Sequence, residues 1–394
     1  MTTTVGRESA VEAARVLAPA FASRAVSYDR DASFPVEDFA DLRAAGLLGL
    51  MVPTRLGGAG AGFADYADVA MELAAGNGAT ALIFNMHASV TGALALTSDE
   101  MARAVGAPES YFAMRDRVLA AASDGALYGV AMSERAAGSR LSQLETTYRP
   151  DGDGWRISGV KTFCSGAGHA DAYLVAARAI DDQAKVSQFL VAAESPGIAV
   201  TQTWDPLGMR ATASNDVSFD VVVPPDALVG GIEGLGVLLA QVMPQWLVAS
   251  YSAVYVGVAQ SALDAAVSYV DGRGLGRLPA VRARLGRADA GVAAARAVVR
   301  EAARRVDAAP GHPETNRWVW RAKLLAGETA ATVAASMLEA CGTAAMRRGN
   351  PLERLYRDAR CGSLQPATSD VCADWLGLAA LGKDPENDAE VRRW

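Results

Sequence analysis

Cysteine and histidine are scarce in this sequence, which has four cysteines and three histidines among 394 residues. Cys164, Cys341, Cys361 and Cys372 show no CxxC spacing and have no cluster of histidines around them. Zinc sites and disulfide frameworks are recognised by such spacings. We therefore expect a reduced, cytoplasmic protein without a metal site.

Excess positive charge and long hydrophobic runs are also missing. The chain has 44 acidic and 37 basic residues, whereas a nucleic-acid surface needs clustered basic charge. Segment 1–8 is polar and lacks the apolar region of a signal peptide. The apolar stretch 79–96 contains Asn85 and His87, so we predict a buried helix there rather than a bilayer span. Neither nucleic acid nor a membrane is expected as a partner.

Hydrophobic residues make up 51% of the chain, enough for a large core divided into two or three units. Residues 1–124 show helical periodicity, and residues 125–233 show short alternating runs separated by turn signals such as 150–154 (PDGDG). Long helical patterns return over residues 234–394. The prediction is an α+β fold, mostly α, in which a helical domain is followed by a small barrel or sandwich and an antiparallel helical bundle.

Five short segments occur in a fixed order along the chain. They are residues 46–50 (GLLGL), 131–139 (AMSERAAGS), 159–166 (GVKTFCSG), 207–210 (LGMR) and 352–360 (LERLYRDAR). Each alone is a weak signal, but together they resemble the acyl-CoA dehydrogenase superfamily over nearly the whole chain. The resemblance implies an N-terminal helical domain, a central β-barrel and a C-terminal four-helix bundle, usually in a homodimer or homotetramer.

The resemblance also implies a flavin cofactor, FAD, with FMN as a second option. The isoalloxazine ring is flat and amphipathic, so it needs an apolar slot and fixed polar contacts at its edges. The family pattern assigns Phe163 to a ring face and Ser165 to the neighbourhood of N5, although Phe163 on its own would be interpreted as a core aromatic. The implied cofactor-binding residues are Val130, Met132, Ser133, Ser139, Phe163, Ser165, Arg273, Glu339, Gly342 and Thr368.

The catalytic base that the resemblance leads one to expect is missing. Dehydrogenases of this family use a carboxylate to remove a proton from the α-carbon of a thioester, and such a base contributes about 10²- to 10⁴-fold in rate. Pro366 stands where most members have this Glu, and residues 241–251, where a minority place it, contain no Asp or Glu. Asp370 lies nearby, but its position after Thr368 and Ser369 predicts a helix cap.

Other elements depart from the family pattern as well. The Arg-x-x-Phe-Gly element, which helps to hold the adenosine end of the neighbouring subunit's FAD, is reduced to residues 271–276 (DGRGLG). The Gln-x-x-Gly-Gly element becomes residues 339–343 (EACGT), and Arg140 replaces the Asp that usually follows Gly-Ser. We therefore expect altered or weakened binding of the adenosine end.

Relatives without the base include monooxygenases that take reduced flavin from a separate reductase, form a C4a-hydroperoxide and hydroxylate aromatic carbon or amine nitrogen. This chemistry needs a dry pocket. The leading hypothesis is therefore a reduced-flavin-dependent monooxygenase of a bulky aromatic or apolar small molecule. His87 and Ser165 are the candidate catalytic residues, although His87 also fits a core histidine bonded to a backbone carbonyl. The predicted pocket walls are Phe84, Met132, Trp246, Tyr251, Gln365 and Pro366.

Two alternatives stay open. The first is an α,β-dehydrogenase of acyl-CoA or acyl-carrier-protein thioesters whose base comes from a displaced position. The second is a non-redox protein that keeps the fold as a scaffold, which the eroded element around Arg273 allows. Flavin reduction by a panel of acyl-CoA thioesters would identify the first alternative, and failure to bind any flavin would identify the second.

Overall fold

The computed structural model describes residues 7–390, and its first third is helical as predicted. The six helices of this part are α1 (Arg7–Asp31), α2 (Val36–Ala44), α3 (Phe63–Gly76), α4 (Gly78–Leu96), α5 (Asp99–Ala104) and α6 (Glu109–Ser123). The side chain of Asn77 caps α4 by accepting a hydrogen bond from the amide of Ala79 (3.1 Å). Nearly every residue of α4 is buried, which confirms the buried helix predicted over 79–96.

The central part is a curled seven-stranded sheet, the barrel-like unit expected from the alternating polarity. Its strands are β1 (Tyr128–Ala131), β2 (Thr147–Asp151), β3 (Gly154–Cys164), β4 (Ala172–Ala179), β5 (Val186–Ala192), β6 (Ile198–Thr201) and β7 (Asn215–Val223). Their order is β1-β4-β2-β3-β7-β6, and β5 pairs with β4 off this path. The antiparallel hairpin of β2 and β3 turns where predicted, with Gly152 at a φ of 60°.

The last part is a bundle of long helices. It contains α7 (Leu235–Val242), α8 (Ser250–Gly272), α9 (Pro279–Ala308), α10 (Pro313–Cys341), α11 (Pro351–Arg360) and α12 (Ser369–Ala380). Three of these helices begin with proline, which lacks only an amide that the first turn of a helix leaves unpaired anyway. The packing of α8, α9, α10 and α11 against one another forms the predicted four-helix bundle.

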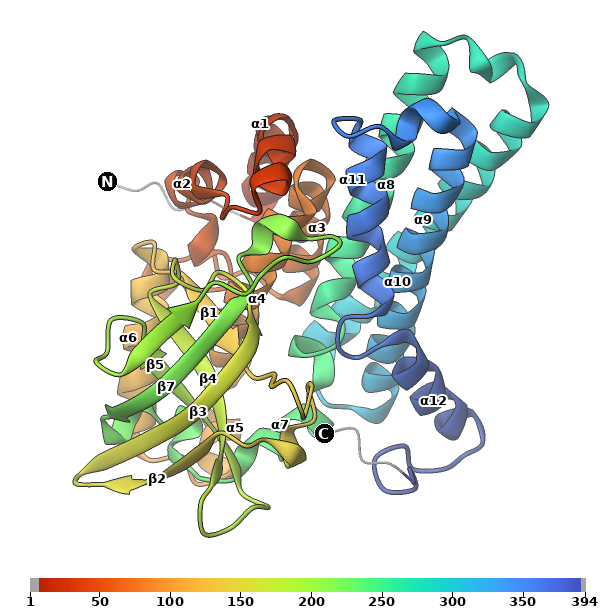
Figure 1. The fold of residues 1–394 in the computed structure, drawn as a ribbon. Coiled ribbons are helices and arrows are strands. Elements are labelled where there is room, and N and C mark those ends of the chain that lie inside the picture. The colour runs from red at the N-terminus through yellow and green to blue at the C-terminus, as the bar shows by residue number, and fades with distance from the viewer. Residues whose placement is uncertain (1–6, 391–394) are drawn as a thin grey trace.

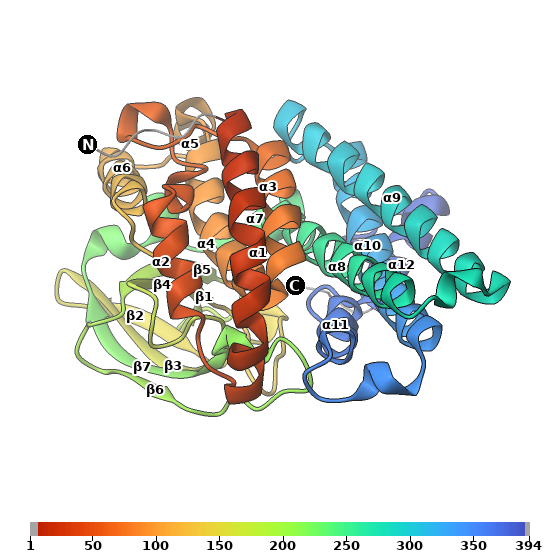
Figure 2. The ribbon, with the colours of Figure 1, turned by 90° about the horizontal axis from the view of Figure 1, so that it is seen from above.

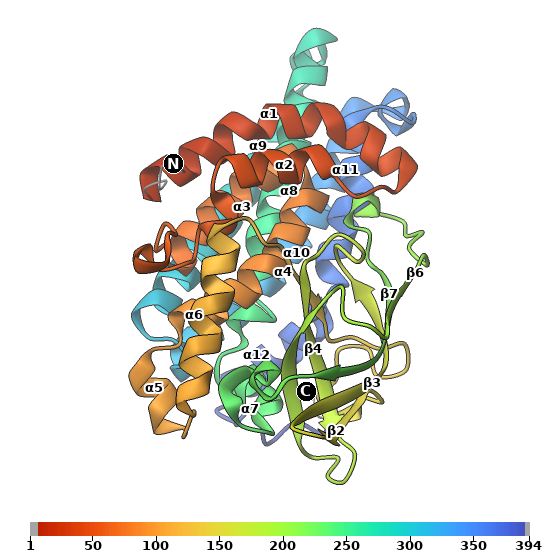
Figure 3. The same ribbon diagram turned by 90° about the vertical axis from the view of Figure 1, so that its left-hand side faces the viewer.

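Helix α4 is the element that all three parts share. It contacts β1 on one side and α8 on another, and Figure 1 shows the sheet, the N-terminal helices and the bundle arranged around it. Figure 2 shows α1 lying along α3 above this core. Figure 3 shows α7 below α4 and next to the sheet, where it contacts β5. A ligand site between the three parts is therefore walled partly by α4.

Two segments of the described chain are long and apolar enough to cross a bilayer by length and composition alone. They are α4 and residues 244–272, and 83% and 61% of their most apolar windows are buried inside the protein. Such burial is typical of core helices. We propose domain limits at 124/125 and 233/234, which fall in the connections before β1 and before α7.

Candidate functional site

An apolar cavity of about 430 Å³ lies between α4, β1, α7 and the start of α8. Met132, Trp246 and Tyr251, three of the residues predicted for the substrate pocket, line this cavity together with Val130 at the end of β1. Most of the other walls are aliphatic, among them Leu94, Val105, Leu174, Leu235, Leu239 and Leu247. A cavity of this size and lining suits a bulky, mostly apolar small molecule.

The indole ring of Trp246 is packed against α4 at a position that only glycine allows. A Cβ built on Gly92 would lie 2.2 Å from the ring, so the missing side chain of Gly92 makes the space that the indole occupies. Phe63 meets the same ring edge-on, with centroids 5.1 Å apart. The shape of the cavity at Trp246 is therefore set by neighbours that leave the ring little freedom.

Ionisable groups are nearly absent from the cavity wall. Among the described residues that line it, Asp307 is the single carboxylate. Its two oxygens accept hydrogen bonds from the amides of Phe63 (2.7 Å) and Ala64 (2.9 Å) at the start of α3, and the residue is exposed. Asp307 thus caps a helix at the edge of the cavity, and no other carboxylate of residues 7–390 lines the cavity.

The loop in which most relatives carry their base is fixed away from the cavity. Gln365 and Pro366 do not line it, contrary to the prediction, because Gln365 turns toward the bundle and accepts a hydrogen bond from the hydroxyl of Tyr255 (2.5 Å). The buried ammonium of Lys323 donates to the carbonyls of this loop at residues 362, 365 and 367. Burial lowers the pKa of Lys323 to about 8.

The hydroxyl of Thr368 ends this loop by capping α12. It accepts a hydrogen bond from the amide of Val371 (3.3 Å). The cap predicted for Asp370 is therefore wrong by two residues, and Asp370 lies in the first turn of the helix. The side chain of Thr368, one of the implied cofactor contacts, is therefore hydrogen-bonded to the first turn of α12.

His87 and Phe84 lie behind the cavity wall rather than on it. Nε2 of His87 donates to the carbonyl of Leu48 (2.7 Å), and its Nδ1 accepts from the amide of Tyr128 (3.2 Å). Burial lowers the pKa of His87 to about 4, so the ring is neutral near pH 7. With both nitrogens bonded to backbone, the geometry does not support the catalytic role predicted for His87. Phe84 is 1% exposed and packs on Tyr66, so it supports the wall from behind.

The strand ends implied to contact the flavin do meet beside the cavity. A buried ion pair between Lys161 and Glu134 (2.7 Å) joins β3 to the segment after β1, and the carbonyl of Ser133 accepts the amide of Thr162 (2.9 Å). Glu134 also accepts from the amide of Glu145 (2.6 Å). Ser139 lies half-buried in the following turn. These bonds fix the backbone on which a cofactor ring edge would rest.

Phe163 has a solvent-exposed aromatic side chain. It is 60% exposed, its φ is 58°, and its ring meets Trp204 edge-on with centroids 5.9 Å apart. Phe163 is therefore not a core aromatic. An exposed ring face next to a buried hydroxyl, Ser165, suits a flat amphipathic ligand.

Ser165 belongs to a row of three buried hydroxyls. Its Oγ lies 2.9 Å from Oγ of Ser214, which lies 2.7 Å from Oγ1 of Thr212. Thr212 in turn donates to the carbonyl of Met209 (2.9 Å). Thr212 and Ser214 are functional candidates that the sequence did not reveal, since they lie almost fifty residues after Ser165 and no motif links them to it.

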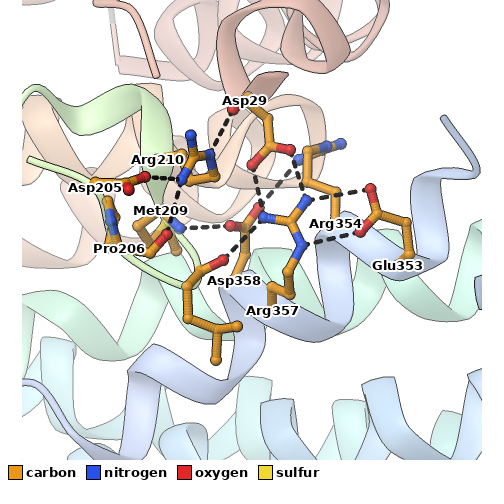
Figure 4. Close-up of polar contacts among 10 residues, drawn as sticks. Asp29, Asp205, Pro206, Met209, Arg210, Glu353, Arg354, Arg357 and Asp358 are labelled. Atoms are coloured by element: carbon orange, nitrogen blue, oxygen red, sulfur yellow. Dashed lines mark hydrogen bonds and ion pairs between the residues drawn. The ribbon is translucent and has the colours of Figure 1, made fainter. Parts of the chain in front are cut away.

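The loop that carries Thr212 and Ser214 is anchored to α1 and α11 by charged residues (Figure 4). The amide of Met209 donates to Asp358 of α11 (2.6 Å), which also pairs with Arg354 (3.2 Å). Arg357 pairs with Asp29 of α1 (2.6 Å) and donates to the carbonyl of Leu207 (2.9 Å). The segment 352–360, noticed in the sequence for its resemblance alone, is thus the support of the loop.

Three implied cofactor residues lie elsewhere in the chain. Arg273 follows α8 and stacks on Tyr269, Glu339 pairs with Arg284 (2.5 Å), and Gly342 ends α10 at a φ of 75°. They gather where α8 and α10 end, at the tip of the bundle away from the sheet (Figure 1). Within one chain, these three residues therefore do not lie beside Ser165. This position is compatible with the expectation that the segment around Arg273 contacts the flavin of a neighbouring subunit.

Comparison with known families covers almost the entire chain. Residues 7–110 match the acyl-CoA dehydrogenase N-terminal domain, residues 129–222 the middle domain, and residues 240–374 the C-terminal domain.

Individual relatives fall into two kinds of flavoenzyme. The chain is 33% identical to L-evernosamine nitrososynthase of Micromonospora sp., over 94% of this chain and 89% of the relative. It is 29% identical to the mitochondrial short-chain specific acyl-CoA dehydrogenase of Bos taurus, over 88% and 83%. FMN-bound TdsC of Paenibacillus sp. A11-2, a dibenzothiophene monooxygenase, superposes with a TM-score of 0.83 at 27% identity, over 95% and 97% of the two chains.

Proposed function

Because the chain belongs to the acyl-CoA dehydrogenase superfamily of flavin-dependent enzymes, we propose that it is a reduced-flavin-dependent monooxygenase. The proposed substrate is a bulky aromatic or otherwise apolar small molecule. The observation that carries the proposal is the cavity wall, in which Asp307 is the single carboxylate among the described lining residues and is occupied in capping α3. Desaturation of a thioester needs a free carboxylate there, and oxygenation does not.

The residues around Ser165 fit a flavin. Phe163 offers an exposed ring face, the backbone of Val130, Met132 and Ser133 offers polar groups at a strand end, and Ser165 offers a buried hydroxyl. Ser139 and Thr368 would add contacts at the edge. When bound in its reduced form, the flavin supplies the electrons that activate oxygen. TdsC with bound FMN supports FMN beside FAD as the cofactor.

The remaining cofactor contacts support an assembly. Arg273, Glu339 and Gly342 lie at the bundle tip, so in a homodimer or homotetramer they would face the flavin of a neighbouring subunit. Their departure from the family pattern favours a flavin bound weakly at its adenosine end. Such a flavin can arrive already reduced, which is why we propose a separate flavin reductase as partner. The cytoplasmic location inferred from the sequence stays a prediction.

The chain's own residues act mainly by excluding water. The aliphatic walls and the indole of Trp246 line most of the cavity, and Tyr251 and Gln245 are among its few polar residues. A dry, preshaped cavity holds the substrate near the ring and limits unproductive loss of activated oxygen to solvent. Ser165 would hold one edge of the ring by a hydrogen bond, and His87, neutral and buried, keeps α4 in register with β1.

The proposal is tested by oxygen labelling. The purified protein is supplied with reduced FMN or FAD and ¹⁸O₂, and is offered indole, dibenzothiophene and a nucleotide-linked amino sugar. We expect incorporation of one labelled oxygen atom into an aromatic substrate. Consumption of reduced flavin without labelled product from any of the three would contradict the proposal.

An acyl-thioester dehydrogenase is the second candidate, because a mitochondrial acyl-CoA dehydrogenase is among the relatives. In that case Asp307 at the cavity edge is the carboxylate available to act as base. The variant Asp307→Asn would then abolish reduction of bound flavin by acyl-CoA. If the protein is an oxygenase, the same variant lowers only stability, because it weakens a helix cap.

A further inference from the structure

We propose that Thr212 and Ser214 are positioning residues that turn the Ser165 hydroxyl into an obligatory hydrogen-bond acceptor, so that the site prefers reduced flavin over oxidised flavin. The inference rests on the proposed binding of flavin beside Ser165, and it adds which redox state the protein selects. It follows from the direction in which each hydroxyl of the buried row must donate.

The direction is fixed at the Thr212 end. Oγ1 of Thr212 lies 2.9 Å from the carbonyl oxygen of Met209, and a carbonyl can only accept, so the single hydroxyl hydrogen of Thr212 points to Met209. Thr212 can then only accept from Ser214 (2.7 Å), and Ser214 can only accept from Ser165 (2.9 Å). The hydrogen of Ser165 therefore points to Ser214, and its lone pairs are what remain for a ligand.

The acceptor at the end of the row is held rigidly. Met209 has a left-handed backbone with a φ of 55°, and its amide donates to the buried carboxylate of Asp358 (2.6 Å). The neighbouring Gly208 lies so close to α11 that a Cβ would be 2.2 Å from the carbonyl oxygen of Arg357. Arg210 secures the other side by donating to the carbonyl of Asp29 (2.8 Å), as Figure 4 shows. The Met209 carbonyl thus stays where Thr212 needs it.

Burial keeps water from reversing the row. Ser165, Thr212 and Ser214 are 7%, 1% and 5% exposed, and no described residue other than Ser214 bonds to the hydroxyl of Ser165. Reversal would give up the hydrogen bond from Thr212 to the Met209 carbonyl, which keeps only the bonds from the amide of Thr212 (3.1 Å) and from Nε1 of Trp204 (3.3 Å), so a reversed row has one hydrogen bond fewer. The polarity of the row is therefore built into the folded chain.

The two redox states of flavin differ at N5, the atom that we place opposite the hydroxyl of Ser165. Reduced flavin carries an N–H at N5, whereas N5 of oxidised flavin has a lone pair. An acceptor-only hydroxyl pairs with the first and repels the second. One buried hydrogen bond gained, together with one lone-pair repulsion avoided, corresponds to an affinity ratio of roughly 10-fold in favour of the reduced form. The preference suits a protein that receives its flavin reduced.

The test compares dissociation constants of oxidised and of anaerobically reduced FMN for the full-length protein, measured by equilibrium dialysis. We expect the wild type to bind reduced FMN about 10-fold more tightly. In Ser214→Ala the hydroxyl of Ser165 is free to donate to oxidised N5, so the ratio should fall by roughly 3- to 10-fold. Thr212→Val should do the same, because Ser214 then loses its acceptor and can donate toward Ser165.

The matched control is Ser218→Ala, which removes a hydroxyl bonded to the Ala199 carbonyl on the outer face of the sheet, and it should leave the ratio unchanged. Circular dichroism verifies that each variant is folded. A wild type that binds both forms equally, or a ratio unaffected by both Ser214→Ala and Thr212→Val, would overturn the inference. Failure of folded wild type to bind either form would overturn the inference and the proposed function together. Altered ratios without any oxygenated product would sustain the inference and contradict the function.

Discussion

The two sides of the candidate site are built by opposite means. On the cavity side, aliphatic and aromatic side chains surround about 430 Å³, and shape is fixed by packing, as where Gly92 makes room for Trp246. On the side of Ser165, shape is fixed by directed bonds, from the pair of Arg357 with Asp29 to the hydroxyls of Thr212 and Ser214. Apolar packing tolerates substrates of different structure. Directed hydrogen bonds, in contrast, recognise individual donor and acceptor atoms of the cofactor.

We therefore expect the stability of the protein to depend strongly on single charged groups on the side of Ser165. Arg357→Met should lower the free energy of unfolding by about 3–5 kcal/mol, because it leaves the buried carboxylate of Asp29 and the half-buried carboxylate of Glu353 without their partner. Urea denaturation measures the change. Arg156→Met is the control, since its pairs with Asp151 and Asp220 are partly exposed and should contribute about 0–1 kcal/mol. Equal losses in the two variants would contradict the comparison.

The cavity side is instead sensitive to added volume. Gly92→Ala should push the ring of Trp246 from its place and lower the free energy of unfolding by about 1–3 kcal/mol. Binding of bulky aromatic ligands should weaken as well, which isothermal titration measures. Gly291→Ala in α9 meets nothing nearer than 3.7 Å, so it should stabilise the helix by roughly 0.5–1 kcal/mol. Unchanged ligand binding in Gly92→Ala would show that Trp246 does not shape the cavity.

His87 provides a pH test of the wall behind the cavity. Its pKa is lowered to about 4 by burial, so between pH 6.5 and pH 4 the unfolded chain binds a proton that the folded chain does not. The contribution of His87 to stability is therefore complete above pH 6.5 and is lost as the pH falls toward 4. From pH 7 to pH 5 the loss is about 2 kcal/mol. Urea denaturation of His87→Gln should show a loss smaller by this amount, and an identical loss in variant and wild type would rule out a buried neutral imidazole.

The smallest expected effect concerns Gln245, a polar side chain in the apolar wall. Its Oε1 is buried and has no hydrogen-bond partner among residues 7–390. Gln245→Leu should leave the stability of the free protein unchanged or raise it by up to about 1 kcal/mol. The variant should discriminate less than the wild type between indole and N-methylindole in a binding titration. Equal discrimination by both proteins would remove Gln245 from substrate recognition.

The sequence predicted the order of helices, strands and helices because those features depend on local periodicity and turns. It also predicted Met132, Trp246 and Tyr251 in one cavity, since a family pattern preserves which elements meet. It did not predict the row from Ser165 to Thr212, because that row depends on how a distant loop packs on α11. His87 and Gln365 were assigned to the site but are turned away, His87 by two backbone groups and Gln365 by Tyr255. A side chain's partners, which decide its chemistry, are set by tertiary packing.

If the cavity offers no base for an acyl thioester, acyl-CoA cannot reduce the bound flavin, and an anaerobic experiment can measure this. Protein loaded with oxidised FMN or FAD is mixed with a panel of short-, medium- and long-chain acyl-CoA thioesters, and the flavin absorbance near 450 nm is followed. We expect the absorbance to persist with every thioester. Bleaching of the flavin together with formation of an enoyl-CoA would show that a carboxylate reaches the substrate and that the protein is a dehydrogenase.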